Sequence, residues 1–357
     1  MIRTRGLTKD FVVSRHETVH AVRGIDLDVE AGELVAVLGP NGAGKTTTMR
    51  MLTTLLAPTS GTAHVAGHDV TTAPHRVRAA IGYVGQGNGA ASVQQVRDEL
   101  VLQGRVHGLD RRAAGYRADE LLEALDLAPL ARRKVDSLSG GQRRRLDVAL
   151  GLVQAPPLLF LDEPSTGLDP HNRANLWEHV LRLHTRSAES SGPPTTIVLT
   201  THYLDEADTM AERVVVVDHG EVIADDTADA LKADLAGDHV ALQAAPEHLA
   251  VLAQIAERDA GTREVAVDVT ADHDGAGDAG PDRLATGVVS VRSTDGTRAV
   301  PGLLRAADAA GVDVLGVQVS RPTLDDVFLA LTGRSLRETA LDPSSGRTPD
   351  LTKEVAR

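Results

Sequence analysis

One stretch of the chain has the residue types and spacing of a phosphate-binding loop. It runs Gly39-Pro40-Asn41-Gly42-Ala43-Gly44-Lys45-Thr46-Thr47, between an expected buried strand and an expected helix. Glycines let successive backbone N–H groups form an anion-binding nest, and the helix N-terminus adds about half a positive charge. We expect Lys45 to contact the β- and γ-phosphates of a nucleotide and the Thr46 hydroxyl to bind Mg²⁺. The alternative is a glycine-rich turn followed by a chance Lys-Thr pair.

A second motif supplies two neighbouring carboxylates. The apolar run at residues 158–161 is typical of a buried strand, and Asp162 and Glu163 follow it directly. Such a strand would carry Asp162 to the phosphate end of a sheet, where it can hold Mg²⁺. Glu163 can then polarise the attacking water as a general base. Alone, Asp-Glu after a strand is a weak signal, but beside a phosphate loop it predicts a nucleotide-hydrolysing site.

The pentapeptide Leu138-Ser139-Gly140-Gly141-Gln142 carries a specific resemblance. It is the signature sequence of ATP-binding-cassette (ABC) ATPases, and the chain resembles that family from about Ile2 to Ala224. The resemblance implies an α/β P-loop cassette, with a RecA-like core and a helical subdomain, that uses ATP and Mg²⁺. It also implies that Ser139, Gly140, Gly141 and Gln142 bind the γ-phosphate of an ATP held by a second subunit, at a helix N-terminus. Two chains would then form a head-to-tail homodimer around two nucleotides.

Four further positions match family motifs. Gln86, in IGYVGQ, matches the glutamine that touches Mg²⁺ and water and senses the membrane partner. Asp169, in TGLD, matches the loop that links the two active sites, and His202, in TTHYLDEAD, matches the switch histidine on the γ-phosphate. Phe11, in LTKDF, matches the aromatic that stacks on adenine, although a buried strand Phe would look the same. The resemblance thus assigns catalysis to Lys45, Gln86, Glu163 and His202, and metal binding to Thr46, Gln86 and Asp162.

Hydrophobic patterns predict the elements that position these residues. Buried strands are expected at residues 32–38, 158–161, 196–200 and 214–217, with helices at about 44–56 and from about Gly140 to Pro156. Shorter strands are expected at 62–65 and around Val70. Helical periodicity over residues 96–130 predicts a helical subdomain at about 90–140. This alternation predicts an α/β layer structure and a cassette over residues 1–225.

Residues 226–335 predict a separate, small α+β domain. The expected order is strand (240–243), helix (248–258), two strands (264–269 and 288–292), helix (302–310), strand (312–319) and closing helix (324–331), which fits a ferredoxin-like unit. Residues 322–333, PTLDDVFLALTG, resemble the closing motif of the daunorubicin-resistance type of drug-export ATPase. Leu324, Val327, Phe328 and Leu331 would form one apolar helical face, which core packing alone explains. Residues 336–357 are rich in Ser, Pro, Thr and charge, and predict a disordered tail.

Composition narrows the class of protein. A net charge of -13 argues against nucleic acid as a partner. The absence of cysteine excludes disulfides, thiolate metal sites and a Cys nucleophile. The N-terminus lacks the apolar run of a secretory signal, and the longest nearly apolar stretch, 148–161, is too short to span a bilayer. With the resemblance, this predicts a peripheral subunit held on the cytoplasmic side of the cell membrane by an integral-membrane permease, exporting a drug, antibiotic or other hydrophobic compound.

Three other functions fit the sequence less well. A ribosome-associated ABC ATPase usually carries two cassettes in one chain, and this chain has one phosphate loop. A DNA-repair ABC ATPase needs a long coiled coil between Gln86 and Ser139, and the interval is too short. A binding module without turnover is disfavoured because Lys45, Asp162, Glu163 and His202 are all present.

Overall fold

The computed structural model describes residues 1–15, 17–87, 89–189, 195–233, 238–258, 262–268, 286–293 and 296–335. These residues form two compact units, Met1–Ala228 and Asp229–Ser335. The sequence predicted a boundary after residue 225. The predicted tail at 336–357 lies outside the described residues.

A six-stranded sheet forms the centre of the first unit. Its order is β10 (Glu221–Asp226), β9 (Arg213–Asp218), β3 (Leu34–Leu38), β8 (Thr196–Thr201), β7 (Leu158–Asp162) and β6 (Ile81–Val84). All neighbours are parallel except β10, which pairs antiparallel with β9 at the edge. Every residue of β3, β7 and β8 is buried, as expected for parallel strands covered on both faces. The carboxyl ends of these three strands therefore meet at one edge of the sheet.

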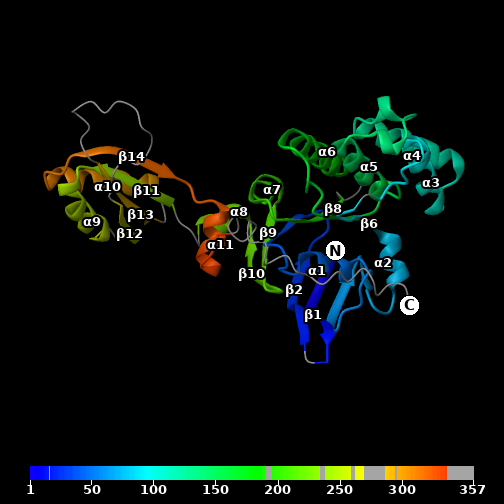
Figure 1. Ribbon diagram of the computed structural model, residues 1–357, viewed down its shortest axis with the longest axis horizontal. Helices are drawn as coiled ribbons and strands as arrows, with labels where there is room; N and C mark the ends of the chain where they lie inside the picture. Colours follow the sequence, from blue (N-terminus) through cyan, green and yellow to red (C-terminus); the bar gives the residue numbers. More distant parts are fainter. Residues whose placement is uncertain are drawn as a thin grey trace. The chain divides into compact units, whose positions relative to one another are not determined.

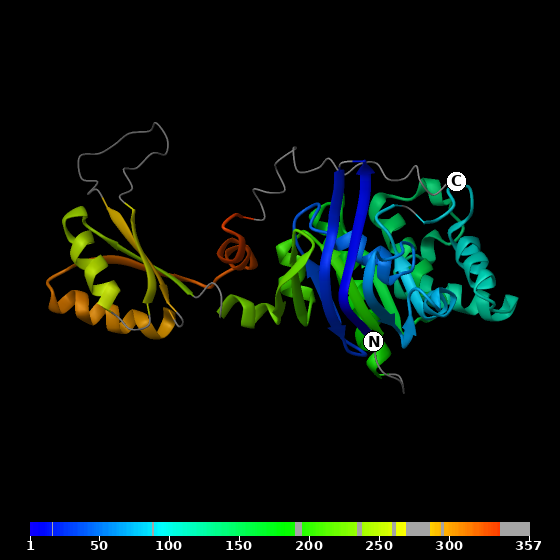
Figure 2. The ribbon, with the colours of Figure 1, turned by 90° about the horizontal axis from the view of Figure 1, so that it is seen from below.

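A second, antiparallel sheet was not predicted in full. Its order is β2 (Glu17–Val29), β1 (Ile2–Ser14), β4 (Ser60–Val65) and β5 (His68–Asp69). The two long strands β1 and β2 run side by side (Figure 2), with register shifts that interrupt the regular alternation. Their inward residues, including Leu7, Ile25 and Leu27, join the same hydrophobic core as residues of the central sheet.

Helices flank the strands of the first unit. The bounds are α1 (Lys45–Leu52), α2 (Pro74–Ala80), α3 (Val96–Val106), α4 (Arg111–Ala124), α5 (Gly140–Leu152), α6 (Pro170–Glu189) and α7 (Leu204–Met210). Short 3₁₀ turns lie at Ala128–Leu130 and Val135–Ser137. Helices α3 and α4 pack together beside α5 (Figure 1), within the range predicted as a helical subdomain. Helix α1 ends at Leu52, earlier than the expected Leu56.

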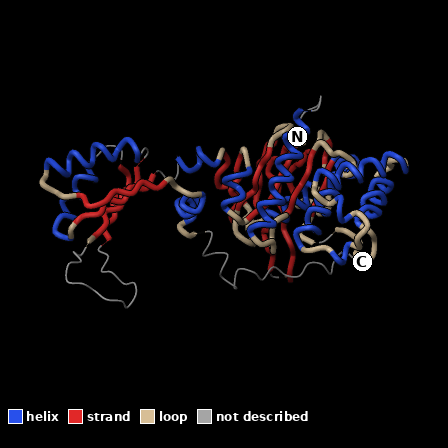
Figure 3. Tube along the Cα trace, turned by 90° about the horizontal axis from the view of Figure 1, so that it is seen from above, coloured by secondary structure: helices blue, strands red, loops and turns tan. Residues whose placement is uncertain are grey.

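The second unit has the predicted order of elements. After α8 (Ala228–Leu231), which straddles the boundary, come β11 (Asp238–Ala244), a 3₁₀ turn (Pro246–His248), α9 (Leu249–Arg258), β12 (Thr262–Asp268), β13 (Gly287–Ser293), α10 (Gly296–Ala309), β14 (Val314–Ser320) and α11 (Leu324–Thr332). The antiparallel sheet has the order β12-β13-β11-β14. Helices α9 and α10 pack on one face of it (Figure 3). Alternate strand residues such as Val240 and Val289 are buried in the core of this unit. This is a ferredoxin-like arrangement.

Two helices of this unit refine the sequence-based picture. Helix α10 begins at Gly296 rather than at Gly302, so Pro301 lies inside the helix instead of before it. Helix α11 is capped by Thr323, whose side chain and that of Asp326 form a capping box. Leu324, Val327 and Phe328 are buried, whereas Leu331, the fourth residue of the predicted apolar face, is half-buried.

Candidate active site

The phosphate loop connects β3 to α1 and has a conformation that glycine alone adopts easily. Gly44 caps α1 with φ 101° and ψ 0°, in the left-handed region. A Cβ atom there would also lie 2.5 Å from the backbone oxygen of Ala21. Because α1 begins at Lys45 with no acidic residue in its first turn, its N-terminus keeps the positive field that attracts an anion.

Lys45 points back across its own loop. Its Nζ donates hydrogen bonds to the backbone oxygens of Gly39 (2.7 Å) and Pro40 (3.0 Å), and lies 3.6 Å from Glu163 Oε1. The residue is only 4% exposed. Burial lowers the pKa of Lys45, while the charges of Glu163 and Asp162 oppose that shift. The two sequence motifs are thus in direct electrostatic contact.

The three predicted metal ligands lie together. Thr46 Oγ1 donates to Asp162 Oδ1 at 3.0 Å, and Gln86 Nε2 donates to Thr46 Oγ1 at 2.9 Å. Thr200 Oγ1, on β8, donates to the same Asp162 oxygen at 2.7 Å. Burial raises the pKa of Asp162, and these hydroxyl hydrogen bonds partly offset the shift. The described ranges hold no group of three or more His, Cys, Asp or Glu suited to a metal. One carboxylate, one hydroxyl and one amide instead fit Mg²⁺, which binds few protein ligands together with nucleotide phosphates.

Glu163 lies between Lys45 and His202. Its Oε2 is 3.6 Å from His202 Nδ1 and accepts a hydrogen bond from Thr166 Oγ1 at 3.2 Å. Burial alone would raise the pKa of Glu163, but His202 and Lys45 outweigh it and hold the pKa below its usual value. The residue has φ 47°, and its backbone N–H donates to Thr200 Oγ1 at 3.0 Å. The side chain is therefore an ionised carboxylate at neutral pH, the form that accepts a proton from water.

The signature residues begin α5. Ser139 caps the helix, with Ser139 Oγ accepting from the Gln142 N–H at 3.3 Å and Gln142 Oε1 accepting from the Ser139 N–H at 3.0 Å. Ser139 and Gly140 are exposed. Gly141 is buried against α6, where a Cβ would lie 2.4 Å from Asn172 Oδ1. The signature thus combines an exposed helix N-terminus with a tight helix–helix contact.

Comparison with known proteins identifies the family. The family model described as ABC transporter matches residues 22–166. The chain is 43% identical to the daunorubicin resistance ATP-binding protein DrrA3 of Streptomyces coeruleorubidus over 342 residues, which cover 94% of this chain and 98% of that protein. It is 41% identical to the daunorubicin/doxorubicin resistance ATP-binding protein DrrA of Streptomyces peucetius, over 92% of this chain and 93% of that protein. The chain belongs to this family of ABC ATPases.

Solved structures agree with the fold. A dimeric ATP-binding cassette in a post-hydrolysis state, bound to ADP and Pi, matches with a TM-score of 0.57 and 24% identity, and covers 64% of this chain and 98% of that chain. The predicted P-loop cassette fold and the resemblance to the daunorubicin-resistance type are both confirmed. As an ABC ATPase, the protein binds ATP and hydrolyses it in a reaction coupled to transport.

Two predicted residues lie at the edge of the ABC site. Asp169 is exposed before α6 and its carboxylate accepts hydrogen bonds from the backbone and side chain of Asn172, at 3.0 and 2.6 Å. These bonds lower the pKa of Asp169. Phe11 is half-buried opposite Val19, on the strand pair that also carries Ala21 beside the phosphate loop. The adenine-stacking role of Phe11 stays a prediction.

Arg144 is a part of the ABC site that the sequence did not reveal. It lies on α5, is 8% exposed, and donates to the backbone oxygens of Pro164 (2.5 Å), Gly85 (2.7 Å), Asp162 (3.3 Å) and Glu163 (3.4 Å). One guanidinium thus ties the signature helix to the segments that carry Gln86 and Glu163. The available signal was its spacing from Gly141 and Val148, which places it on the buried face of the helix.

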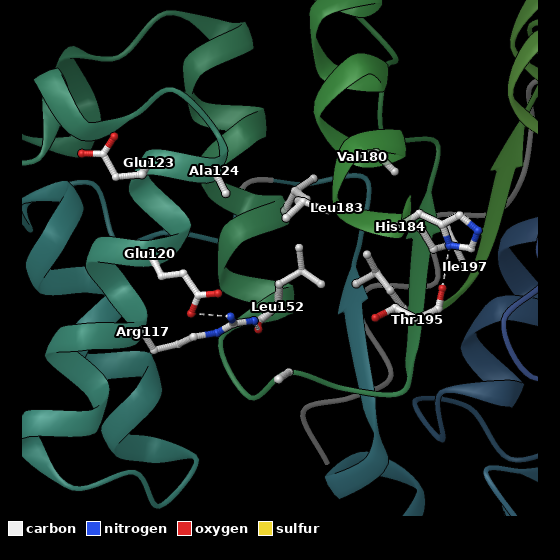
Figure 4. A pocket seen from close by; sticks show the side chains of 13 residues that line it. Arg117, Glu120, Glu123, Ala124, Leu152, Val180, Leu183, His184, Thr195 and Ile197 are labelled. Atoms are coloured by element: carbon white, nitrogen blue, oxygen red, sulfur yellow. Dashed lines mark hydrogen bonds and ion pairs between the residues drawn. The ribbon is translucent and has the colours of Figure 1, made fainter. Parts of the chain in front are cut away.

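A cavity of about 650 Å³ lies elsewhere in the cassette, between α4, α5, α6 and β8 (Figure 4). None of the predicted site residues lines it. Its polar groups pair with one another: Arg117 donates to Glu120 and to the Leu152 oxygen, both at 2.8 Å, and His184 Nδ1 lies 2.8 Å from the Thr195 oxygen. The phosphate loop is not part of this cavity, so we do not assign the cavity to ATP binding.

Proposed function

We propose that this ABC ATPase powers the export of a drug, antibiotic or other hydrophobic compound through a separate integral-membrane permease. The export of drugs is supported by relatives that are named for daunorubicin and doxorubicin resistance and that align over nearly their whole length. The observation that carries the catalytic part is a single network of contacts of 3.6 Å or less. Lys45 and His202 both contact Glu163, Thr46 donates to Asp162, and Thr200 joins the two halves, because its hydroxyl donates to Asp162 and accepts from the Glu163 N–H.

Each residue of this network has a proposed role. Lys45 and the backbone N–H groups of the loop bind the β- and γ-phosphates of ATP. Thr46, Gln86 and Asp162 would hold Mg²⁺, which neutralises phosphate charge when bound. Glu163 accepts the proton of the attacking water, and His202 contacts the γ-phosphate. Most of the rate enhancement would then come from electrostatic stabilisation at a site whose donors are already in place.

The proposed assembly is a head-to-tail homodimer. Ser139, Gly140 and Asp169 are exposed although they belong to the family's catalytic motifs, which suits residues that act on a nucleotide bound by a second copy. A related cassette structure is itself dimeric and holds ADP and Pi. Turnover would therefore require two chains.

The substitution Glu163→Gln tests the catalytic assignment. Glutamine keeps the shape and the hydrogen bond from Thr166 but cannot accept a proton at neutral pH. We expect phosphate release to fall by about 10²–10⁴-fold while ATP binding, measured with a fluorescent nucleotide, is retained. The control is Glu178→Gln on α6, an exposed carboxylate paired with Arg182 at 2.7 Å, which should hydrolyse ATP normally. Turnover by Glu163→Gln within a few-fold of wild type would refute the general-base role.

A groove beside Gln86 is the proposed docking site for the permease. It has a volume of about 340 Å³, and its lining includes Gly85 and Gly87, Gln103 on α3, and Leu55. Leu55 is 58% exposed and offers an apolar contact beside this groove. A helix of the permease placed there would contact the segment that carries Gln86, and so could sense the nucleotide.

Membrane fractionation tests this part. Within the described ranges, each helix is too short or too polar to cross a bilayer. We therefore expect the protein to pellet with membranes only when its permease is co-expressed. Leu55→Arg should abolish that association and leave basal ATP hydrolysis intact, whereas Val12→Arg, at another exposed apolar position, should not. Membrane association without any permease would contradict the peripheral, permease-held subunit.

A further inference from the structure

A second cluster of buried polar side chains lies next to His202. Glu206, on α7, is 3% exposed, and its Oε2 accepts a hydrogen bond from Thr201 Oγ1 at 2.7 Å. Its other oxygen, Oε1, is buried and makes no hydrogen bond within the described part of the chain. That oxygen faces Arg173 Nε on α6, at 3.7 Å, which is also buried without a hydrogen-bond partner among these residues.

Arg173 also stacks on the neighbour of His202. Its guanidinium carbon lies 3.7 Å from the centre of the Tyr203 ring, and that ring centre is 4.1 Å from the centre of the His202 ring. The Tyr203 N–H donates to Thr201 Oγ1 at 2.9 Å, which joins the stack to the Glu206 carboxylate. Arg173 therefore contacts both supports of the His202 side chain: the aromatic ring beside it and the carboxylate that anchors its backbone turn.

The other end of this chain of contacts is the Asp169 loop. The backbone N–H of Arg173 donates to the backbone oxygen of Asp169 at 3.0 Å. The Asp169 carboxylate accepts hydrogen bonds from Asn172 and so holds the first turn of α6. A displacement of Asp169 would therefore move the turn that carries Arg173. Asp169 itself is exposed, so a second chain can reach it.

We propose that Arg173 is a positioning residue that couples the Asp169 loop to His202 and, through His202, to Glu163. This inference rests on the proposed roles of His202 and Glu163. Two of these contacts, Arg173–Glu206 at 3.7 Å and His202–Glu163 at 3.6 Å, have distances slightly too long for hydrogen bonds. His202 Nδ1, like the two facing atoms of the other pair, is buried without a partner in the described structure. Because unpaired buried polar atoms are costly, a small shift of α6 that brings Arg173 to Glu206 is favourable. Through the Tyr203 ring, which contacts both Arg173 and His202, the same shift would move His202 toward Glu163. Contact of a second chain with Asp169 supplies such a shift.

The first test is Arg173→Met, which keeps most of the apolar stem and removes the guanidinium. We expect kcat for ATP hydrolysis to fall by about ten- to a hundredfold, because misplacement of a catalytic group by a fraction of an ångström to 1 Å has that effect. KM for ATP should change by less than about twofold, since the phosphate loop is untouched. Arg182→Met is the matched control on the same helix, where Arg182 pairs with Glu178 at the surface. A raised KM with unchanged kcat would overturn the proposal.

A double-mutant cycle separates positioning from a general loss of structure. In a His202→Ala background, Arg173→Met should cause no further loss of kcat, because the residue it acts through is gone. Fully additive losses would overturn the coupling. If Arg173→Met does not fold, Tyr203→Leu removes the stacking and should lower kcat in the same way, whereas normal kcat in that variant contradicts the proposal. If His202→Ala itself hydrolyses ATP normally, the proposed role of His202 fails. If His202→Ala is impaired but Arg173→Met and Tyr203→Leu keep a normal kcat, only the coupling through Arg173 fails.

Discussion

Arg144 offers the sharpest test of how the cassette holds its active site together. Replacing it with methionine removes hydrogen bonds to four backbone oxygens, of which those to Pro164 and Gly85 are short. Hydrogen bonds from a charged donor contribute about 1.5–3 kcal/mol each. The change also removes the ion-pair partner of Asp147, which is 4% exposed and whose Oδ2 lies 3.9 Å from Arg144. Breaking a buried ion pair from one side costs about 3–5 kcal/mol. These contributions do not add, because methionine also removes the cost of burying the guanidinium. We therefore expect Arg144→Met to destabilise the cassette by about 3–5 kcal/mol, as for breaking one buried ion pair.

Urea unfolding can measure this directly. Trp177 is the one tryptophan of the chain and is buried in α6, so its fluorescence reports on the cassette alone. Adding Asp147→Asn to Arg144→Met should restore part of the stability. Burial already raises the pKa of Asp147, and asparagine can still accept the Gly89 N–H. The control Arg112→Met, at an exposed position of α4, should change the unfolding free energy by less than about 0.5 kcal/mol.

Turnover gives the second readout for the same variant. Gly85 directly precedes Gln86, and two of the other acceptors are Asp162 and Glu163 themselves. Loss of Arg144 should therefore lower kcat even at temperatures where the variant is folded. An Arg144→Met protein whose unfolding free energy lies within about 1 kcal/mol of wild type would refute the reasoning, because it would mean that the four carbonyl contacts contribute almost nothing.

Two further predictions concern the dimer and the metal ligand. Ser139→Arg should bind ATP but lose turnover, because the bulky cation blocks the exposed start of α5, where the second chain's nucleotide would lie. The control Ser137→Arg, at an exposed position just before the helix, should hydrolyse ATP. Normal hydrolysis by Ser139→Arg would contradict the head-to-tail arrangement. Asp162→Asn should lose activity yet raise the thermal midpoint at pH 7 without nucleotide or Mg²⁺, by a few degrees for each ~1 kcal/mol. Burial raises the pKa of Asp162 above 3.8 in the folded protein. The protonated side chain therefore contributes stability below pH 3.8, and this contribution is lost as the pH rises through the folded pKa. Calorimetry should show the gain shrinking toward pH 3.8, and a lower midpoint at pH 7 would count against it.

The chemistry-bearing residues were predictable because their partners share a strand edge. Once 32–38, 158–161 and 196–200 are recognised as buried strands, parallel pairing places the residues that follow them at one edge of the sheet. Lys45, Glu163 and His202 then meet, as the distances of 3.6 Å show. The long strands β1 and β2 were missed because bulges, such as that between Thr4 and Leu7, interrupt the two-residue alternation.

Arg144 and Arg173 were missed for a different physical reason. A motif is recognisable when each member must be a particular residue type, as with a lysine that meets phosphate or a carboxylate that holds a metal. Arg144 instead binds backbone oxygens, which every residue has, so its partners at Gly85 and Pro164 leave no trace in the residue types. Arg173 contacts the side chains of Tyr203 and Glu206, but these lie on a separate segment that only the fold brings to α6. Residues that hold a catalytic group in place are thus defined by contacts that only the fold brings together. Residues that touch the substrate are defined by the chemistry of their side chains, and only these can be recognised in a single sequence.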